Sequence, residues 1–114
     1  MKNIYDIFSV EGKRVLITGA ANGNGEVIAK AFGRAGSKLF LLDIDHNNLE
    51  IVANKIEKET SSIVDRAQVD LSNLKQVDKF LEINNNFDVV INNAGVTFGN
   101  HLFEYKDSDW DLTY

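Results

Sequence analysis

Three glycines stand close together near the start of the chain, in the segment Thr18-Gly-Ala-Ala-Asn-Gly-Asn-Gly25. This spacing suits a backbone that leaves a strand, turns sharply around a diphosphate and enters a helix. In this interpretation Gly19 allows the tight turn, Gly23 leaves room for the diphosphate, and Gly25 brings the helix close to the strand. The helix N-terminus adds N–H groups and a partial positive charge that favour an anion. The segment therefore predicts a dinucleotide site.

An acidic residue follows at a distance that suits the same ligand. Asp43 stands 18 residues after Gly25, close to the roughly 20 expected for the carboxylate that binds the adenosine ribose hydroxyls. A carboxylate about 4 Å from the 2′-phosphate of NADP would disfavour it by roughly 4 kcal/mol, or about a thousandfold in affinity. No Arg or Lys stands within the glycine segment or directly after Asp43, where Ile44 follows. The sequence therefore favours NAD over NADP.

Two other classes of nucleotide-binding protein also use a glycine turn. A nucleotide-binding P-loop is disfavoured because Glu26 follows Gly25, where a Lys and a Ser or Thr would be needed. A methyltransferase that binds S-adenosylmethionine also has a glycine turn and an acid at a strand end, and this alternative stays open at this point.

The elements that must position these residues follow from apolar periodicity. Four apolar segments predict strands, the first and second being continuous enough to be buried on both faces: Arg14–Thr18, Lys38–Asp43, Arg66–Leu71 and Phe87–Ile91. Three intervening segments have apolar residues at helical spacing: Val27, Ile28, Ala31, Phe32 and Ala35; then Leu49, Val52, Ala53 and Ile56; then Leu74, Val77, Phe80 and Leu81.

Local signals mark where the three helices begin and end. Gly36 suits the end of the first, and Asn47 with Glu50 resembles a capping box for the second. Ser72 is the predicted N-cap of the third, and the run Asn84–Asn86 ends it. The strict alternation predicts an α/β fold with a parallel sheet, in which right-handed crossovers place the first two helices on one face and the third on the other. We expect a Rossmann-type doubly wound sheet of about four strands, incomplete, with the order 3-2-1-4.

Composition narrows the class of protein. The 114 residues are 44% hydrophobic and 25% charged, with net charge −5, which is typical of one globular domain spanning 1–114. The acidic balance without a basic stripe argues against nucleic acid and membrane surfaces as partners. Cysteine is absent and the histidines are His46 and His101 alone, so no metal site is expected. With no membrane helix or signal peptide in the sequence, we expect a cytoplasmic protein.

A second motif gives the glycine segment a family context. Asn92-Asn93-Ala94-Gly95 directly follows the fourth predicted strand. Together with the pattern TGxxxGxG at Thr18–Gly25, it resembles the short-chain dehydrogenase/reductase family. Asp70-Leu71 also stands where that family has an Asp-Val or Asp-Leu pair. The resemblance implies an oxidoreductase that transfers hydride between a nicotinamide cofactor and an alcohol or carbonyl substrate.

The resemblance assigns a cofactor role to each matching residue. It implies that the diphosphate and the adenosine ribose are lined by Gly19, Asn22, Gly23, Asn24 and Gly25, with Asp43 on the ribose hydroxyls. It also implies that the adenine lies beside Asp70 and Leu71, and the nicotinamide-side ribose beside Asn92, Ala94 and Gly95. Asn93 would brace the sheet. Asn24 departs from the family, which usually has an aliphatic residue at this position.

The family's catalytic residues have no counterpart in this sequence. They are a Ser and the Tyr and Lys of a YxxxK motif, and none of Tyr5, Tyr105 and Tyr114 is followed by a Lys four residues later. We therefore expect the cofactor-binding half of a longer enzyme, inactive by itself, whose apolar fourth strand is an exposed edge prone to self-association. The alternative is a non-catalytic NAD-binding module or sensor that pairs with a partner.

Overall fold

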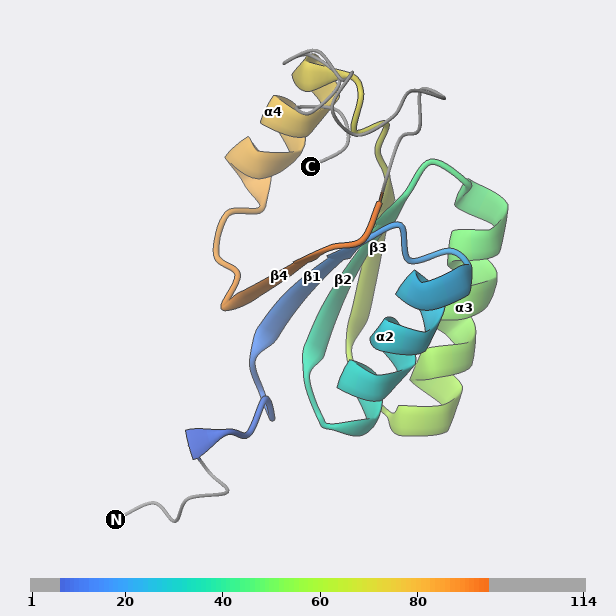
Figure 1. Ribbon diagram of the computed structural model, residues 1–114, viewed down its shortest axis with the longest axis vertical. Coiled ribbons are helices and arrows are strands. Elements are labelled where there is room, and N and C mark those ends of the chain that lie inside the picture. Colours follow the sequence, from blue (N-terminus) through green and yellow to red (C-terminus); the bar gives the residue numbers. More distant parts are fainter. Residues whose placement is uncertain (1–6, 95–114) are drawn as a thin grey trace, which may run out of the picture.

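The computed structural model describes residues 7–94, which form a four-stranded parallel sheet with three helices (Figure 1). In chain order the elements are β1 (Arg14–Thr18), α2 (Gly23–Arg34), β2 (Lys38–Asp43), α3 (His46–Thr60), β3 (Val64–Gln68), α4 (Leu74–Ile83) and β4 (Val89–Asn92). The strand order is β3-β2-β1-β4, as predicted.

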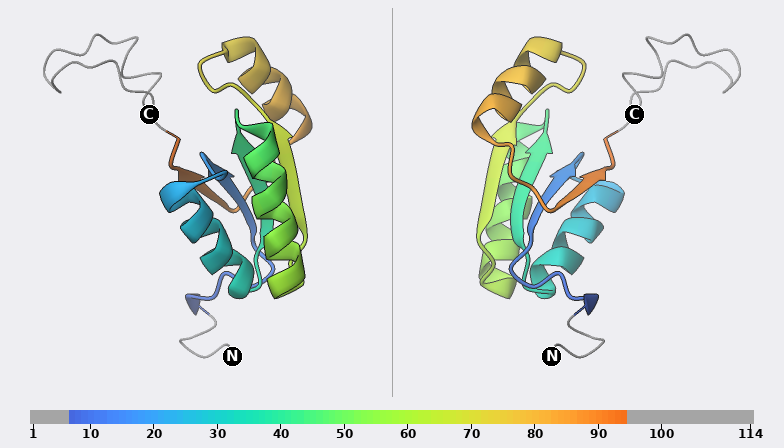
Figure 2. Two further views of the ribbon diagram at one scale, coloured as in Figure 1. Left: turned by 90° about the vertical axis from the view of Figure 1, so that its right-hand side faces the viewer. Right: turned by 90° about the vertical axis from the view of Figure 1, so that its left-hand side faces the viewer.

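The helices cover opposite faces of the sheet, which confirms the doubly wound arrangement. In the side views, α2 and α3 lie next to each other on one face, and α4 lies on the other (Figure 2). Each crossover joins parallel strands, so the right-handed rule fixes this distribution. All four strands point the same way, and the turns after β1 and β2 therefore meet at one end of the sheet (Figure 1).

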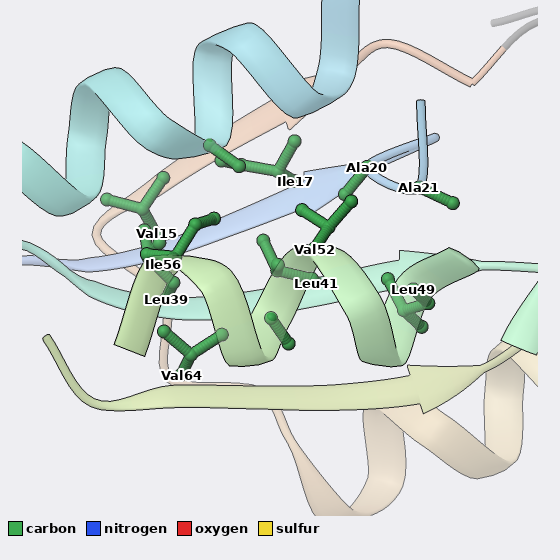
Figure 3. Packing of buried hydrophobic residues seen from close by; sticks show 12 residues of the cluster. Val15, Ile17, Ala20, Ala21, Leu39, Leu41, Leu49, Val52, Ile56 and Val64 are labelled. Atoms are coloured by element: carbon green, nitrogen blue, oxygen red, sulfur yellow. The ribbon is translucent and has the colours of Figure 1, made fainter. Parts of the chain in front are cut away.

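The main core lies between the sheet and the pair α2 and α3 (Figure 3). Because side chains alternate along a strand, Val15 and Ile17 of β1 point to this face and are fully buried. The predicted apolar face of α3 is confirmed, since Leu49, Val52, Ala53 and Ile56 are all buried there.

The second core, under α4, is smaller and aromatic. Phe40 of β2 makes edge-to-face contacts with Phe80 of α4 and with Phe87, at ring centroid distances of 5.0 and 6.1 Å. The predicted apolar face of α4 is only partly buried: Phe80 is 8% exposed, whereas Leu74 is 72% and Leu81 43% exposed. These two leucines and Val90 of β4 line an apolar groove beside the helix.

The predicted apolar face of α2 is wrong at three of its five residues, since Val27, Ala31 and Ala35 are exposed and only Ile28 and Phe32 pack against the core. Val27 is 65% exposed, and the buried residues are the small ones at a spacing of four, Gly25, Ala29 and Gly33. The reason is close helix packing, since a Cβ on Gly33 would lie 2.8 Å from Cγ2 of Ile56 in α3. Small residues therefore mark the contact that larger apolar residues were expected to make.

The end of α2 is confirmed. Gly36 has a φ of +86°, and its N–H donates to the Gly33 carbonyl at 3.1 Å. The Ser37 N–H donates to the Phe32 carbonyl at 3.1 Å, which completes a Schellman motif.

Both other predicted caps are corrected. The N-cap of α3 is Asp45, whose carboxylate accepts from the Asn48 N–H, and Asn47 lies inside the helix. The N-cap of α4 is Asn73, whose side chain accepts from two backbone N–H groups of the first turn. In each case the neighbouring Asp or Asn has the extended or turn backbone that lets its oxygen reach those groups.

Two strands are shifted from their predicted bounds. β3 begins at Val64 rather than Arg66 because Val64 packs beneath α3, and Arg66 on the same face forms ion pairs with Glu50 and Glu57 of that helix. β4 begins at Val89 rather than Phe87, and just before it the Arg14 N–H of β1 donates to the Asp88 carboxylate rather than to a backbone carbonyl. Val90 is 58% exposed, so β4 is an apolar edge among the described strands.

Candidate nucleotide-binding site

A cavity of about 550 Å³ opens at the carboxyl ends of the strands, the end at which open α/β sheets bind ligands. Its lining includes eight of the eleven residues predicted from the sequence: Gly19, Asn22, Gly23, Asn24, Asp43, Asp70, Leu71 and Ala94. The remaining lining residues are Leu42, Ile44, Val69, Ser72 and Asn93. Residues that are distant in sequence therefore line the same cavity.

The glycine turn is compact where it meets the helix and open where it meets the cavity. Gly19 has a φ of +64°, and a Cβ on Gly25 would lie 1.9 Å from the Gly19 carbonyl oxygen. Gly23 has a φ of +59°, and a Cβ there would meet no atom within 4 Å. The N-cap residue Asn22 makes no side-chain cap hydrogen bond. The first turn of α2 therefore faces the cavity without a carboxamide cap, which suits an anion.

Thr18 ties the glycine turn to the segment after β4. Its buried hydroxyl donates to Oδ1 of Asn92 and accepts from the N–H groups of Asn93 and Ala94, each at 3.1 Å. Asn93 in turn donates its side-chain N–H to the Gly19 carbonyl at 3.2 Å. These bonds hold Ala94 at the rim of the cavity. Thr18 begins the predicted glycine motif without a role of its own there, although a hydroxyl inside an apolar strand indicates a buried hydrogen bond.

Asp43 lies at the end of β2, and both of its carboxylate oxygens are engaged. Oδ2 accepts from the Ala21 N–H at 3.0 Å, and Oδ1 accepts from the Asp45 N–H at 2.9 Å. Next to it, the Ala20 N–H donates to the Leu42 carbonyl at 3.2 Å. The glycine turn is therefore fastened to the end of β2 by two hydrogen bonds.

Asp70 supplies a second carboxylate to the lining. Its Oδ1 accepts from both the backbone N–H and the hydroxyl of Ser72, at 3.0 and 2.6 Å. These hydrogen bonds lower the pKa of Asp70 below its ordinary value. Among residues 7–94, the cavity is lined by Asp43 and Asp70 and by no Lys, Arg or His. Among the described residues, the cavity lining therefore has two carboxylates and no cationic side chain to offset them.

Three of the predicted residues are not among the described lining residues of the cavity. Gly25 lies beneath the turn against Gly19, and Asn92 lies at the end of β4 with its carboxamide on Thr18. Gly95 lies outside the described residues. Four lining residues were not predicted: Leu42, Ile44, Val69 and Ser72. Each adjoins a predicted residue in sequence, and the apolar ones give the cavity walls suited to a flat ring.

A family model for short chain dehydrogenase matches residues 13–114. The chain belongs to the short-chain dehydrogenase family. Among curated relatives, it is 30% identical over 110 residues to 5-keto-D-gluconate 5-reductase of Escherichia coli K12, covering 93% of this chain and 43% of the relative. It is 32% identical over 109 residues to a 3-oxoacyl-[acyl-carrier-protein] reductase of Thermotoga maritima, covering 90% and 43%.

Solved structures of other short-chain dehydrogenases and reductases share the fold. The L-sorbose reductase of Gluconobacter frateurii, complexed with NADPH and L-sorbose, matches with a TM-score of 0.74 and 25% identity over 91% of this chain and 41% of that one. A metagenomic short-chain oxidoreductase in complex with NADP matches with a TM-score of 0.73 and 31% identity over 92% and 49%. The chain thus spans less than half the length of these relatives.

The described part of this chain has neither a membrane-spanning helix nor a cluster of metal-binding side chains. Between residues 7 and 94, no helix is long and apolar enough to cross a membrane. Within the same residues, no three side chains of the metal-binding types His, Cys, Asp and Glu gather in a group that could hold a metal ion.

Proposed function

We propose that this chain is the NAD(H)-binding half of a short-chain oxidoreductase acting on an alcohol or carbonyl compound. The observation that carries the proposal is the meeting of the glycine turn and Asp43 at one cavity, with the first turn of α2 open toward it. NAD(H) would supply the hydride donor or acceptor. The residues of this chain would hold that cofactor and orient it.

The proposed positions follow the order of the lining. The N-terminus of α2, with Gly23 and Asn24, would bind the diphosphate. Asp43 would accept hydrogen bonds from the adenosine ribose hydroxyls. Asp70 and Leu71 would flank the adenine, and the nicotinamide-side ribose would lie beside Asn92, Ala94 and Gly95. Gly23 supports this placement, because a Cβ there would project into open space that the diphosphate needs.

The preference for NAD over NADP is the part of the proposal for which the comparisons give no support, since similar structures hold NADPH or NADP. It rests on charge. Asp43 and Asp70 line the cavity, and no basic side chain among the described residues lines it to neutralise a 2′-phosphate. A phosphate about 4 Å from the Asp43 carboxylate would lose roughly 4 kcal/mol at an effective dielectric constant of about 20.

Calorimetric titration of the full chain with NAD and with NADP tests the proposal. We expect NAD to bind at least about tenfold more tightly, because of the carboxylate at the ribose. Ile44→Arg keeps Asp43 and adds a cation at the cavity wall, and should narrow the difference by raising the affinity for NADP. Tighter binding of NADP to the unsubstituted chain would refute the preference. Binding of S-adenosylmethionine in place of both would refute the proposed function.

The catalytic step is assigned to residues that this sequence lacks. Without the Ser and the YxxxK motif there is no group placed by the family pattern to move a proton at the substrate oxygen. We therefore propose that the 114-residue chain has no turnover with NAD(H) by itself. A dehydrogenase assay with purified chain and a panel of alcohols checks this, and robust NADH production would contradict it.

We also propose a surface for self-association and a cellular compartment for this chain. The exposed apolar edge at β4 is a surface through which copies of the chain associate, with Val90 at its centre. The cytoplasm is the proposed compartment, on the basis of a sequence without cysteine.

A further inference from the structure

Asp43 has contacts that recognition of a ribose does not require. Its Oδ2 accepts from the Ala21 N–H within the glycine turn, and its Oδ1 accepts from the Asp45 N–H at the start of α3. The side chain therefore connects the turn after β1 with the turn after β2.

The contact with Ala21 matters because the donor is buried. Ala21 is 3% exposed, and its N–H stands two residues before Gly23, where α2 begins. A buried N–H group without an acceptor is unfavourable, so the turn is held where the carboxylate can reach it. That position in turn fixes where the first N–H groups of α2 point.

The Asp43 carboxylate has enough acceptor sites to bind both the two backbone N–H groups and the ribose hydroxyls. An ionised carboxylate offers about four lone-pair sites. The two backbone N–H groups take one site on each oxygen, and two sites remain. That is the number needed by the 2′- and 3′-hydroxyls of one ribose.

We propose that Asp43 is a positioning residue for the phosphate-binding turn as well as a ligand of the ribose. The inference rests on the proposed function for its ribose part. It has a consequence that ribose recognition alone lacks: loss of the carboxylate must weaken the binding of the diphosphate itself. The affinity of a nucleotide that lacks ribose hydroxyls should therefore fall as well.

Binding of ADP and of 2′,3′-dideoxy-ADP to the full chain separates the two roles. For Asp43→Ala we expect the affinity of both ligands to fall about tenfold or more, with the larger loss for ADP. The control is Asp65→Asn, which removes an exposed carboxylate of β3 that does not line the cavity. This variant should change the affinity of neither ligand. If dideoxy-ADP binds the Asp43→Ala variant as tightly as the unsubstituted chain, the positioning role is wrong.

Amide hydrogen exchange without nucleotide gives an independent test. In Asp43→Asn, whose shape is conserved, one carboxylate oxygen is replaced by a donor, and the Ala21 amide should exchange about tenfold faster relative to the Leu41 amide of β2. An unchanged ratio would overturn the positioning role. If neither ADP nor NAD binds the unsubstituted chain, the proposed function fails, and the exchange ratio still decides the role of Asp43 in the turn.

Discussion

Gly25→Ala is the sharpest perturbation of the site that this structure offers. In an ordinary helix, Gly→Ala stabilises by about 1 kcal/mol, so helix propensity alone predicts a more stable protein. Here the added Cβ would lie 1.9 Å from the Gly19 carbonyl oxygen, 2.7 Å from its carbonyl carbon and 2.8 Å from Nδ2 of Asn93. Helix propensity therefore predicts a gain in stability for Gly25→Ala, whereas these close contacts predict a loss.

The magnitude follows from how far the backbone must move. Ordinary contact begins at 3.4 Å, so a Cβ at 1.9 Å requires a displacement of about 1.5 Å between α2 and the turn. Overpacking of this kind costs about 1–3 kcal/mol. The displacement also breaks the hydrogen bond from Asn93 to Gly19, which adds about 0.5–1.5 kcal/mol. Set against the propensity gain of about 1 kcal/mol, a net destabilisation of about 0.5–3.5 kcal/mol is expected.

Urea denaturation followed by far-ultraviolet circular dichroism measures this difference. Ala31→Gly, at an exposed position of the same helix, is the matched control, and it should destabilise by about 1 kcal/mol through propensity alone. A Gly25→Ala variant with a urea midpoint at or above that of the unsubstituted chain would refute the close approach of α2 to the turn.

Three further substitutions test other contacts. Thr18→Val leaves the Asn93 and Ala94 N–H groups without their acceptor and should destabilise by about 2 kcal/mol in urea, whereas Thr18→Ser should retain most of the stability. The hydrogen bond from Arg66 lowers the pKa of Glu50 below 4.5, so this pair stabilises the fold above that pH and loses its effect as the pH falls through the lowered pKa. Glu50→Gln should therefore lower the urea midpoint at neutral pH, and the difference should shrink as the pH falls through the lowered pKa of Glu50, while Glu59→Gln should show no such change. Val90→Lys should shift the chain toward monomer in light scattering, and Val27→Lys, at an equally exposed apolar position on α2, should not.

The fold was predictable because its signals are local and repeated. A continuous apolar strand such as Arg14–Thr18 and the periodic face of α3 determine which surfaces must be buried, and handedness then fixes the faces that the helices cover. The contact of α2 with α3 was not predictable in the same way. Gly33 carries no apolar side chain, and its packing against Ile56 depends on a helix crossing that no local pattern encodes.

The caps and strand ends were less predictable for a related reason. Asp45 and Asn47 are both good N-cap residues, and the choice depends on where β2 ends and how the turn leaves it. Likewise Arg66, a charged residue, belongs in the interior of β3 because Glu50 and Glu57 lie across from it on α3. Such partners are distant in sequence, so periodicity alone favours the wrong bounds.

The site shows a second limit of motif-based prediction, which assigns one role to each residue. The motif assigns Asp43 and Asn92 to a cofactor, and in the structure each also forms a hydrogen bond within the protein, Asp43 with the Ala21 N–H and Asn92 with the Thr18 hydroxyl. Because the same atoms shape the turn before a ligand arrives, binding and stability cannot be separated at these positions. A substitution that removes affinity here has to be compared with its effect on the unliganded fold before the loss is assigned to a ligand contact.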